Sequence, residues 1–280
     1  MLPRTILVTG ASTGIGRAAA VMLKARGWRV FATARTEADL AALAALDLEP
    51  LRLDYREAGS IAACAEAVLE RTGGRIGALF NNGAYGQPGA VEDLPTDILR
   101  AQFEANLFGW HDLTCRLIPA MRANGAGRIV QCSSVLGIVA MKYRGAYIAS
   151  KFALEGLTDT LRQELHGSGI TVSTIRPGPI ATRFVSTAMA AFVANIDIDG
   201  SAHRDIYRRR LGRMERGGAG RFKLPPEAVV DRLIHAVESD RPKPYYSVTV
   251  PTYVMDVVRR LLPGRALVGF LRRVSDREDR

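Results

Sequence analysis

Short apolar runs alternate with longer stretches of helical periodicity along most of the chain. Apolar runs that are rich in β-branched residues and bounded by turn residues predict buried strands. The predicted strands span residues 5–9, 29–34, 51–54, 78–81, 128–133, 171–176 and 245–250, and the predicted helices span residues 16–26, 37–45, 60–71, 96–124, 147–168 and 225–239. Strands that alternate with helices predict an α/β fold of three layers, in which helices cover both faces of a doubly wound parallel sheet.

The 280 residues, 48% of them apolar, are enough for one large core or two small ones, and we predict a single domain over residues 1–250. The pattern loosens over residues 183–224, and residues 251–280 form a basic, amphipathic C-terminal extension. The formal net charge of +10 is concentrated late in the chain, because residues 201–280 carry 18 basic and 10 acidic side chains. Such a segment attracts anions, which include a phosphate-bearing cofactor, anionic lipid and nucleic acid.

A glycine-rich turn follows the first strand and opens the first helix. Glycines let the backbone approach a pyrophosphate closely, and the helix N-terminus offers the anion N–H groups and a positive dipole end. The spacing is Gly-x-x-x-Gly-x-Gly rather than Gly-x-Gly-x-x-Gly, but its place between strand and helix is that of a Rossmann-like dinucleotide site. The predicted phosphate-binding residues are Gly10, Ser12, Thr13, Gly14, Ile15 and Gly16.

The end of the second strand indicates which dinucleotide is bound. An NAD site usually places an acidic residue there to hold the ribose 2′-hydroxyl. This strand is followed instead by Arg35, whose guanidinium can grip a 2′-phosphate with paired hydrogen bonds. The sequence therefore favours NADP(H) over NAD(H).

Tyr147 and Lys151 are four residues apart, which places both side chains on one face of a predicted helix. A phenol with a pKa of about 10 is a poor base near neutrality. At about 4 Å and an effective dielectric constant near 20, a lysine ammonium attracts a phenolate by on the order of 4 kcal/mol, which could lower the phenol pKa by up to about three. A tyrosine tuned in this way could exchange a proton with a substrate oxygen.

Five motifs in this order resemble the single-domain branch of the short-chain dehydrogenase/reductase family. They are the loop of residues 9–16, Asn81-Asn82-Gly83-Ala84 after the fourth strand, Ser133-Ser134 after the fifth, the Tyr147/Lys151 pair, and Pro177-Gly178 after the sixth. The resemblance covers about residues 4–185. It implies that residues 1–250 are an NAD(P)-binding catalytic domain with a substrate lid at about residues 183–224. One departure is visible, since the family usually has Asn-Asn-Ala-Gly after the fourth strand.

The resemblance also implies roles for individual residues. Ser134 and Tyr147 would bind the substrate oxygen, Lys151 would also hold the nicotinamide ribose, and Asn106 would bind a water that relays protons. These four residues would form the catalytic set. The further cofactor contacts that it implies are Asp54 beside the adenine, Asn82, Gly83 and Ala84 near the adenine ribose, and Pro177, Gly178, Ile180 and Thr182 around the nicotinamide.

The expected reaction interconverts an alcohol and a ketone or aldehyde, with a bulky hydrophobic substrate that is steroid-like, retinoid-like or long-chain. Apolar side chains in and near the lid suggest this pocket, namely Phe184, Val185, Met189, Phe192, Val193, Tyr85, Met141 and Tyr143. Two alternatives are a non-catalytic NADP-binding regulator and a sugar-nucleotide-modifying enzyme. The regulator would not need all four catalytic residues, and the short chain after the sixth strand argues against the sugar-nucleotide enzyme.

The rest of the sequence bears on location and partners. It shows no secretory signal pattern and no apolar run long enough to span a membrane, so we expect a cytoplasmic protein. The three cysteines, Cys64, Cys115 and Cys132, lack metal-ligand spacing, so we expect reduced core thiols and no metal. The family suggests a homodimer or homotetramer. The C-terminal segment could pack on the domain, on a partner subunit or on an anionic membrane.

A basic segment without aromatic interleaving predicts a solvated face and no nucleic-acid binding. Its residues are Arg208, Arg209, Arg210, Arg213, Arg216, Arg221 and Lys223.

Overall fold

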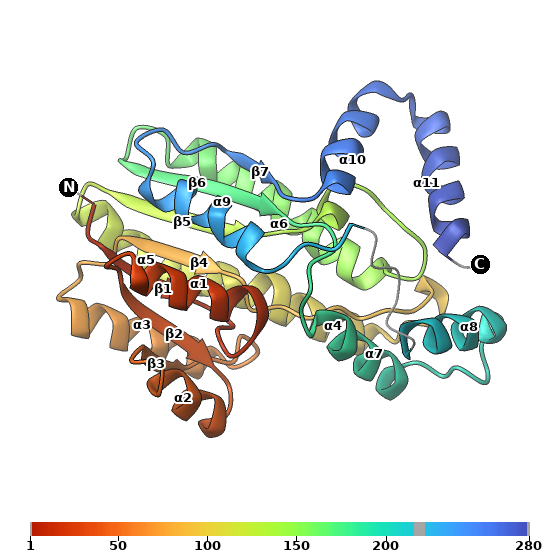
Figure 1. The fold of residues 1–280 in the computed structure, drawn as a ribbon, viewed down its shortest axis with the longest axis horizontal. Coiled ribbons are helices and arrows are strands. Elements are labelled where there is room, and N and C mark those ends of the chain that lie inside the picture. The colour runs from red at the N-terminus through yellow and green to blue at the C-terminus, as the bar shows by residue number, and fades with distance from the viewer. Residues whose placement is uncertain (1, 216–221, 279–280) are drawn as a thin grey trace.

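The computed structural model of the chain describes residues 2–215 and 222–278. The strands are β1 (Thr5–Val8), β2 (Arg29–Ala34), β3 (Glu49–Arg52), β4 (Ala78–Asn81), β5 (Gly127–Cys132), β6 (Ile170–Arg176) and β7 (Tyr245–Ser247). They form one parallel sheet in the order β3-β2-β1-β4-β5-β6-β7 (Figure 1). The predicted doubly wound parallel sheet is therefore confirmed.

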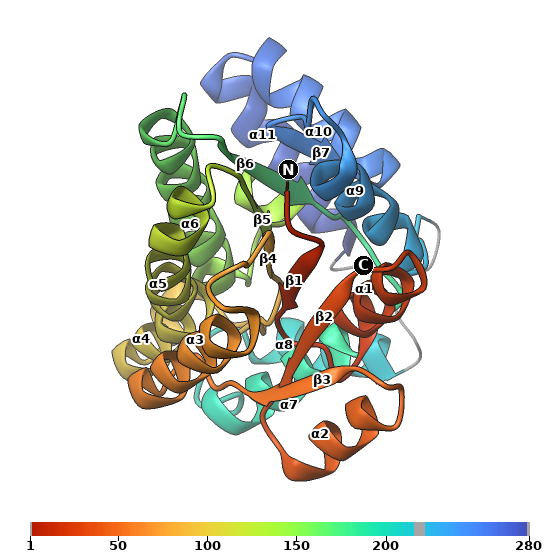
Figure 2. The ribbon, with the colours of Figure 1, turned by 90° about the vertical axis from the view of Figure 1, so that its left-hand side faces the viewer.

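Helices cover both faces of this sheet. The longer ones are α1 (Gly14–Ala25), α2 (Glu37–Ala44), α3 (Ala58–Thr72), α4 (Thr96–Phe103), α5 (Gly109–Ala123), α6 (Gly145–Glu164), α7 (Phe184–Asn195), α8 (Arg204–Glu215), α9 (Glu227–Glu238), α10 (Val250–Leu261) and α11 (Gly264–Glu278). Three short turns are η1 (Val91–Asp93), η2 (Glu104–Phe108) and η3 (Val135–Gly137). Figure 2 shows α3, α5 and α6 on one side of the sheet and α1 and α9 on the other, which confirms the three layers.

The core lies where β1 and β4 meet at the centre of the sheet. Ile6, Leu7 and Val8 in β1 and Leu79 and Phe80 in β4 are completely buried, because helices pack on both faces of these strands. The strand order reverses between β1 and β4, since the chain builds β1 to β3 outward in one direction and β4 to β7 in the other. Such a reversal opens a crevice at the carboxyl ends of the strands, where ligands of this architecture bind.

One predicted helix is interrupted. The prediction of one helix over residues 96–124 is wrong at residues 104–108, where η2 is a π-helical turn between α4 and α5. A π turn adds a residue to the helical repeat and re-aims the side chains that it carries, and such turns are frequent at functional sites. Asn106 lies in this turn.

Some predicted element ends shift because local caps replace strand backbone. The third strand ends at Arg52, before Asp54, whose carboxylate accepts a hydrogen bond from the backbone N–H of Arg56 in a turn. The last strand ends at Ser247, since Thr249 is the N-cap of α10. The predicted boundary at residue 250 thus coincides with the first residue of that helix.

The three cysteines are free, but they are not all in the core. Cys64 and Cys132 are buried, whereas Cys115 is exposed on α5, so the expectation of three core thiols is wrong for Cys115. Among residues 2–215 and 222–278, no helix is long and apolar enough to cross a membrane.

Candidate active site

The predicted phosphate loop is a tight turn between β1 and α1 that only glycines allow. Gly10 and Gly14 have φ values of +63° and +57°, and a Cβ on Gly16 would lie 2.2 Å from the carbonyl oxygen of Gly10. Thr13, the N-cap of α1, makes no side-chain cap bond, and the first turn of the helix contains no acidic residue. Ser12 and Ile15 lie half-buried in the same turn. The N–H groups at this helix start therefore suit an anion such as a pyrophosphate.

The loop after β4 packs directly against the phosphate loop. The Thr9 hydroxyl accepts hydrogen bonds from the backbone N–H groups of Asn82 and Gly83 at 2.8 and 3.2 Å. A Cβ on Gly10 would lie 2.5 Å from the Cα of Gly83, so the two backbones meet without intervening side chains. The inverted Gly83-Ala84 pair thus places its smaller residue at this contact, with Ala84 packed against the core.

Arg35 and Asp54 lie near each other at the carboxyl ends of β2 and β3, and their predicted contact with the adenosine end of a dinucleotide stays a prediction. Asp54 is ion-paired with Arg56 at 3.2 Å. Burial opposes ionisation of Asp54, but hydrogen bonds from Arg56 and the nearby positive charges of Arg56 and Arg35 lower its pKa below the ordinary value. Arg35 itself is exposed directly after β2, where it can contact a ligand.

Tyr147 and Lys151 lie on one face of α6, and both are buried. The Lys151 ammonium donates a hydrogen bond to the Cys132 carbonyl oxygen at 2.9 Å and lies 4.2 Å from the centre of the Trp110 ring. Burial lowers the pKa of Lys151 to about 8. An ammonium group has three protons to donate, and the described residues supply one hydrogen-bond acceptor for them. The hydroxyl groups of a ribose could accept the others.

The expectation that Lys151 lowers the pKa of Tyr147 is wrong for the protein without a bound cofactor. The Lys151 ammonium lies 5.8 Å from the centre of the Tyr147 ring, farther than the assumed contact. Burial is the largest influence and raises the pKa of Tyr147 well above the ordinary value, although a hydrogen bond with Ser134 opposes it. Desolvation of the phenolate therefore outweighs the lysine charge.

Ser134 lies at the carboxyl end of β5, next to the loop after β6. Its hydroxyl accepts a hydrogen bond from the Leu136 N–H at 3.1 Å, which fixes the side chain at the start of η3. The next N–H, from Val135, donates to the Pro177 carbonyl oxygen at 2.8 Å. The second bond places the loop after β6 beside Ser134, and a hydrogen bond between Ser134 and Tyr147 brings the phenol to the same region.

Asn106 is completely buried and holds the loop after β4 in place. Its amide group donates to the Tyr85 carbonyl oxygen at 2.8 Å and to the Ser150 hydroxyl at 3.3 Å, and its amide oxygen accepts from the Tyr85 N–H at 3.2 Å. The side chain thus connects the π turn to α6 one turn from Tyr147. Its predicted water-binding role stays a prediction.

The predicted nicotinamide loop runs from the end of β6 back to the phosphate loop. A Cβ on Gly14 would lie 3.0 Å from the Thr182 Cγ2, so Thr182 is next to the start of α1. The Thr182 hydroxyl accepts from the Phe184 N–H at 3.3 Å, and Ile180 pairs with Leu224. A Cβ on Gly178 would lie 2.0 Å from the Thr249 hydroxyl. Thr249 is a neighbour that the sequence did not reveal, because nothing local connects it to this loop.

The predicted apolar lid residues fall into different environments. The Phe184 ring lies 5.3 Å from the Tyr147 ring, and Gly86, which the sequence analysis missed, leaves room for it, since a Cβ there would lie 3.0 Å from Phe184. Phe192 is buried in a small cluster with Ala90, Ile196 and Tyr207, so the predicted lid segment has a core of its own. Val185 and Val193 are exposed, and their predicted place in a pocket stays a prediction.

The loop before α6 contacts the segment that was predicted to be a lid, residues 183–224. Tyr143 has a φ of +62°, which is unusual for a side chain of its size, and its ring packs against His203 and Tyr207 of the lid. Arg210 lies over the same ring at 4.5 Å, so this arginine is not on a solvated face, contrary to expectation. Arg216 and Arg221 fall outside the described residues.

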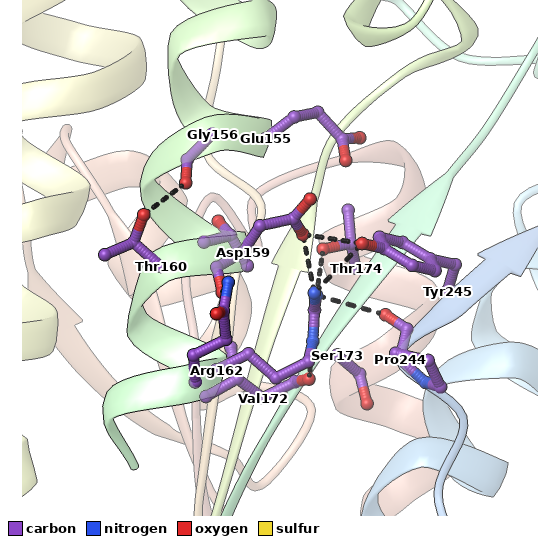
Figure 3. A network of polar contacts seen from close by, with 12 residues as sticks. Glu155, Gly156, Asp159, Thr160, Arg162, Val172, Ser173, Thr174, Pro244 and Tyr245 are labelled. Atoms are coloured by element: carbon purple, nitrogen blue, oxygen red, sulfur yellow. Dashed lines mark hydrogen bonds and ion pairs between the residues drawn. The ribbon is translucent and has the colours of Figure 1, made fainter. Parts of the chain in front are cut away.

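Helix α6 is tied to the sheet by two arginines. The buried Arg176 guanidinium binds Glu155 of α6 with two hydrogen bonds of 2.9 and 2.6 Å. Farther along α6, Arg162 bonds Asp159, the hydroxyls of Thr174 and Tyr245, and the carbonyl oxygens of Val172 and Pro244, as Figure 3 shows. These contacts fix the helix that carries Tyr147 and Lys151 relative to β6 and β7.

Comparison with known proteins agrees with this geometry. The sequence profile described as short chain dehydrogenase matches residues 4–191. The uncharacterized oxidoreductase YbbO of Escherichia coli is 39% identical over 95% of this chain and 93% of its own length. Human retinol dehydrogenase 8 is 31% identical over 86% of this chain and 79% of its own, and human 17-beta-hydroxysteroid dehydrogenase type 1 is 34% identical over 68% and 61%.

Solved structures show the same fold. A short-chain dehydrogenase/reductase from Burkholderia phymatum in complex with NAD has a TM-score of 0.79, 25% identity and coverage of 96% of this chain and 95% of its own. An actinorhodin polyketide ketoreductase with NADPH has a TM-score of 0.70, 29% identity and coverage of 89% and 97%. The chain belongs to the short-chain dehydrogenase/reductase family, and it is an oxidoreductase that acts on CH–OH groups with a nicotinamide dinucleotide.

Proposed function

We propose that the protein is an NADP(H)-dependent oxidoreductase that interconverts a bulky hydrophobic alcohol and its ketone or aldehyde. The observation that carries this proposal is the meeting of Ser134, Tyr147 and Lys151 at the carboxyl end of β5, where Tyr147 bonds Ser134 and Lys151 bonds the Cys132 carbonyl. The first turn of α1 would hold the pyrophosphate, and Lys151 would hold the nicotinamide ribose. When bound, the nicotinamide supplies or accepts the hydride.

The protein's own residues handle the proton and the orientation. Burial keeps the Tyr147 phenol protonated, so it can donate a proton to the carbonyl oxygen as that oxygen gains charge. The Ser134 hydroxyl would donate a second hydrogen bond to the same oxygen and orient it. The nearby Lys151 ammonium would stabilise the phenolate that is left behind. Asn106 would hold a water through which that phenolate regains a proton.

The substrate class rests on the apolar side of the site. Phe184 faces Tyr147 and packs closely against Gly86, so an apolar ring lies next to the reacting phenol. Relatives named for retinol and for a hydroxysteroid support a bulky apolar substrate. We therefore expect faster loss of NADPH absorbance with retinoid, steroid and long-chain carbonyl compounds than with small polar sugars. Better turnover of the sugars would contradict the proposed substrate.

The proposed preference for NADP(H) depends on Arg35. Replacing Arg35 by aspartate removes paired hydrogen bonds to the 2′-phosphate and adds a negative charge that repels it. Each hydrogen bond to a charged group contributes about 1.5–3 kcal/mol, so NADPH binding should weaken about 100-fold or more. NADH binding should change little, and fluorescence titration of both cofactors measures the two effects. Arg75→Asp, at an exposed arginine before β4, is the control. An unchanged cofactor preference in Arg35→Asp would refute the assignment.

The lysine also predicts the dependence of the reduction on pH. Burial lowers the pKa of Lys151 to about 8, so its ammonium is lost as the pH rises through that value. The charged form of Lys151 is the one that would stabilise the Tyr147 phenolate. Because kcat/KM reports the ionisation of the free enzyme, kcat/KM for carbonyl reduction should be level below pH 8 and fall about tenfold per pH unit above it. Initial rates at low substrate across this range test the expectation. A profile that stays level to pH 10 would contradict it.

A further inference from the structure

We propose that the hairpin formed by α10 and α11 is a docking surface for an anionic phospholipid membrane. Figure 1 shows the two helices side by side at one end of the molecule, with the turn that joins them directed away from the sheet. That turn is formed by residues 262–263. The hairpin exposes an apolar stripe and a group of arginines, and these are the two features by which an interfacial helix binds an acidic bilayer.

The apolar stripe follows one face of α10. Its members recur three or four residues apart, as one face of a helix requires, and they are Val250, Tyr253, Val254, Val257 and Leu261. Val257 is 55% exposed and Leu261, next to the turn, is 74% exposed. Val268 on α11 is 68% exposed, so the apolar surface continues past the turn. A helix face this apolar would normally be covered by another surface.

The charges around the stripe favour an anionic surface. All three acidic residues of the described part of the hairpin pair with basic residues: Asp256 with Arg260 and, more distantly, Arg176, Asp276 with Lys142, and Glu278 with Arg144. Meanwhile Arg265 and Arg272 are exposed on the same side of α11 as Val268. The hairpin therefore presents net positive charge outward. The same basic hairpin of a second copy would repel this one, whereas acidic headgroups are attracted to it.

The hairpin is firmly attached next to the candidate active site. Thr249, at the start of α10, packs on Gly178 of the nicotinamide loop. At the far end, α11 holds the loop before α6 through the Glu278–Arg144 pair at 2.6 Å and a hydrogen bond from the Lys142 N–H to the Ser275 hydroxyl at 3.4 Å. The open end of the hairpin is thus anchored to loops of the candidate site, while the turn points away from the sheet (Figure 1).

Vesicle flotation of the full chain tests this surface without requiring turnover, so its outcome is independent of the proposed reaction. The protein should float with vesicles of phosphatidylcholine mixed with phosphatidylglycerol, bind more weakly to phosphatidylcholine alone, and be released by salt. The double substitution Val257→Asp and Leu261→Asp should weaken binding more than about tenfold by placing charge in the apolar stripe. Arg265→Gln with Arg272→Gln should weaken binding to the acidic vesicles about 25-fold, at roughly fivefold per charge.

Val21→Asp, at an exposed valine of α1, is the matched control and should bind like the natural chain. Circular dichroism and NADPH binding identify any variant that fails to fold, since none of the substituted residues lies in the site. Absence of flotation, or full binding by the stripe variant, would overturn the proposal. So would a dimer in light scattering that the stripe variant dissociates while no vesicle binds, because the stripe would then be covered by a second copy.

Discussion

Replacing Tyr147 by phenylalanine should lower kcat for carbonyl reduction by about 10²–10⁴-fold, the usual contribution of a positioned general acid. The phenol is buried beside Ser134, and its raised pKa keeps the proton available for donation. Phenylalanine fills the same volume without the hydroxyl, so the packing against Phe184 should survive. NADPH binding should change little, because Lys151 and the glycine loop remain in place.

Single-turnover loss of NADPH absorbance measures the chemical step, and fluorescence titration measures cofactor binding. Tyr253→Phe, at an exposed tyrosine of α10, is the matched control and should keep full activity. Equal turnover by Tyr147→Phe and the natural chain would exclude the proposed role of Tyr147. Tight NADPH binding by the natural chain without turnover of any carbonyl compound would favour a regulator that senses the cofactor.

Replacing Glu155 by alanine should lower the free energy of unfolding by about 3–5 kcal/mol, because it leaves the Arg176 guanidinium buried without its carboxylate partner. Both side chains are less than one tenth exposed, and two hydrogen bonds of 2.9 and 2.6 Å join them. Asp256 lies 3.8 Å from Arg176, too far to replace those bonds. Urea unfolding followed by circular dichroism measures the loss.

The neighbouring ion pair between Arg162 and Asp159 supplies a comparison on the same helix (Figure 3). The Asp159 side chain is 40% exposed, so water can solvate what its removal leaves behind. Asp159→Ala should therefore cost about 1–2 kcal/mol, for a lost hydrogen bond to Tyr245 and a weak ion pair. If the two alanine variants were equally stable, burial would not be the source of the Glu155 effect.

The features that the sequence predicted correctly depend on short-range patterns. The glycine turn between β1 and α1 is one, because its spacing dictates a backbone that only glycine adopts at Gly10 and Gly14. The Tyr147/Lys151 pair is another, since four residues of helix set their common face. The other site residues were predicted from their positions after strands, because the carboxyl ends of parallel strands meet at one edge of the sheet.

The features that the sequence missed depend on contacts between distant segments. Nothing near Gly178 indicates that Thr249 fills the space where its Cβ would be. The pKa of Tyr147 is set by how much of the fold covers the ring, which no spacing reveals. The π turn at Asn106 likewise has no periodic signature, because five residues cannot show a changed repeat.

The position of β7 in the sheet has a consequence for how the protein is made. β7 pairs with β6, yet α7, α8 and α9 separate the two strands along the chain. During synthesis, the segments with the glycine loop, Tyr147 and Lys151 leave the ribosome first, while β6 is still an uncovered sheet edge. Such an edge can pair with other chains, and closing so long a connection is slow. We therefore expect the interval before Tyr245 emerges to be the period in which the nascent chain most needs a chaperone.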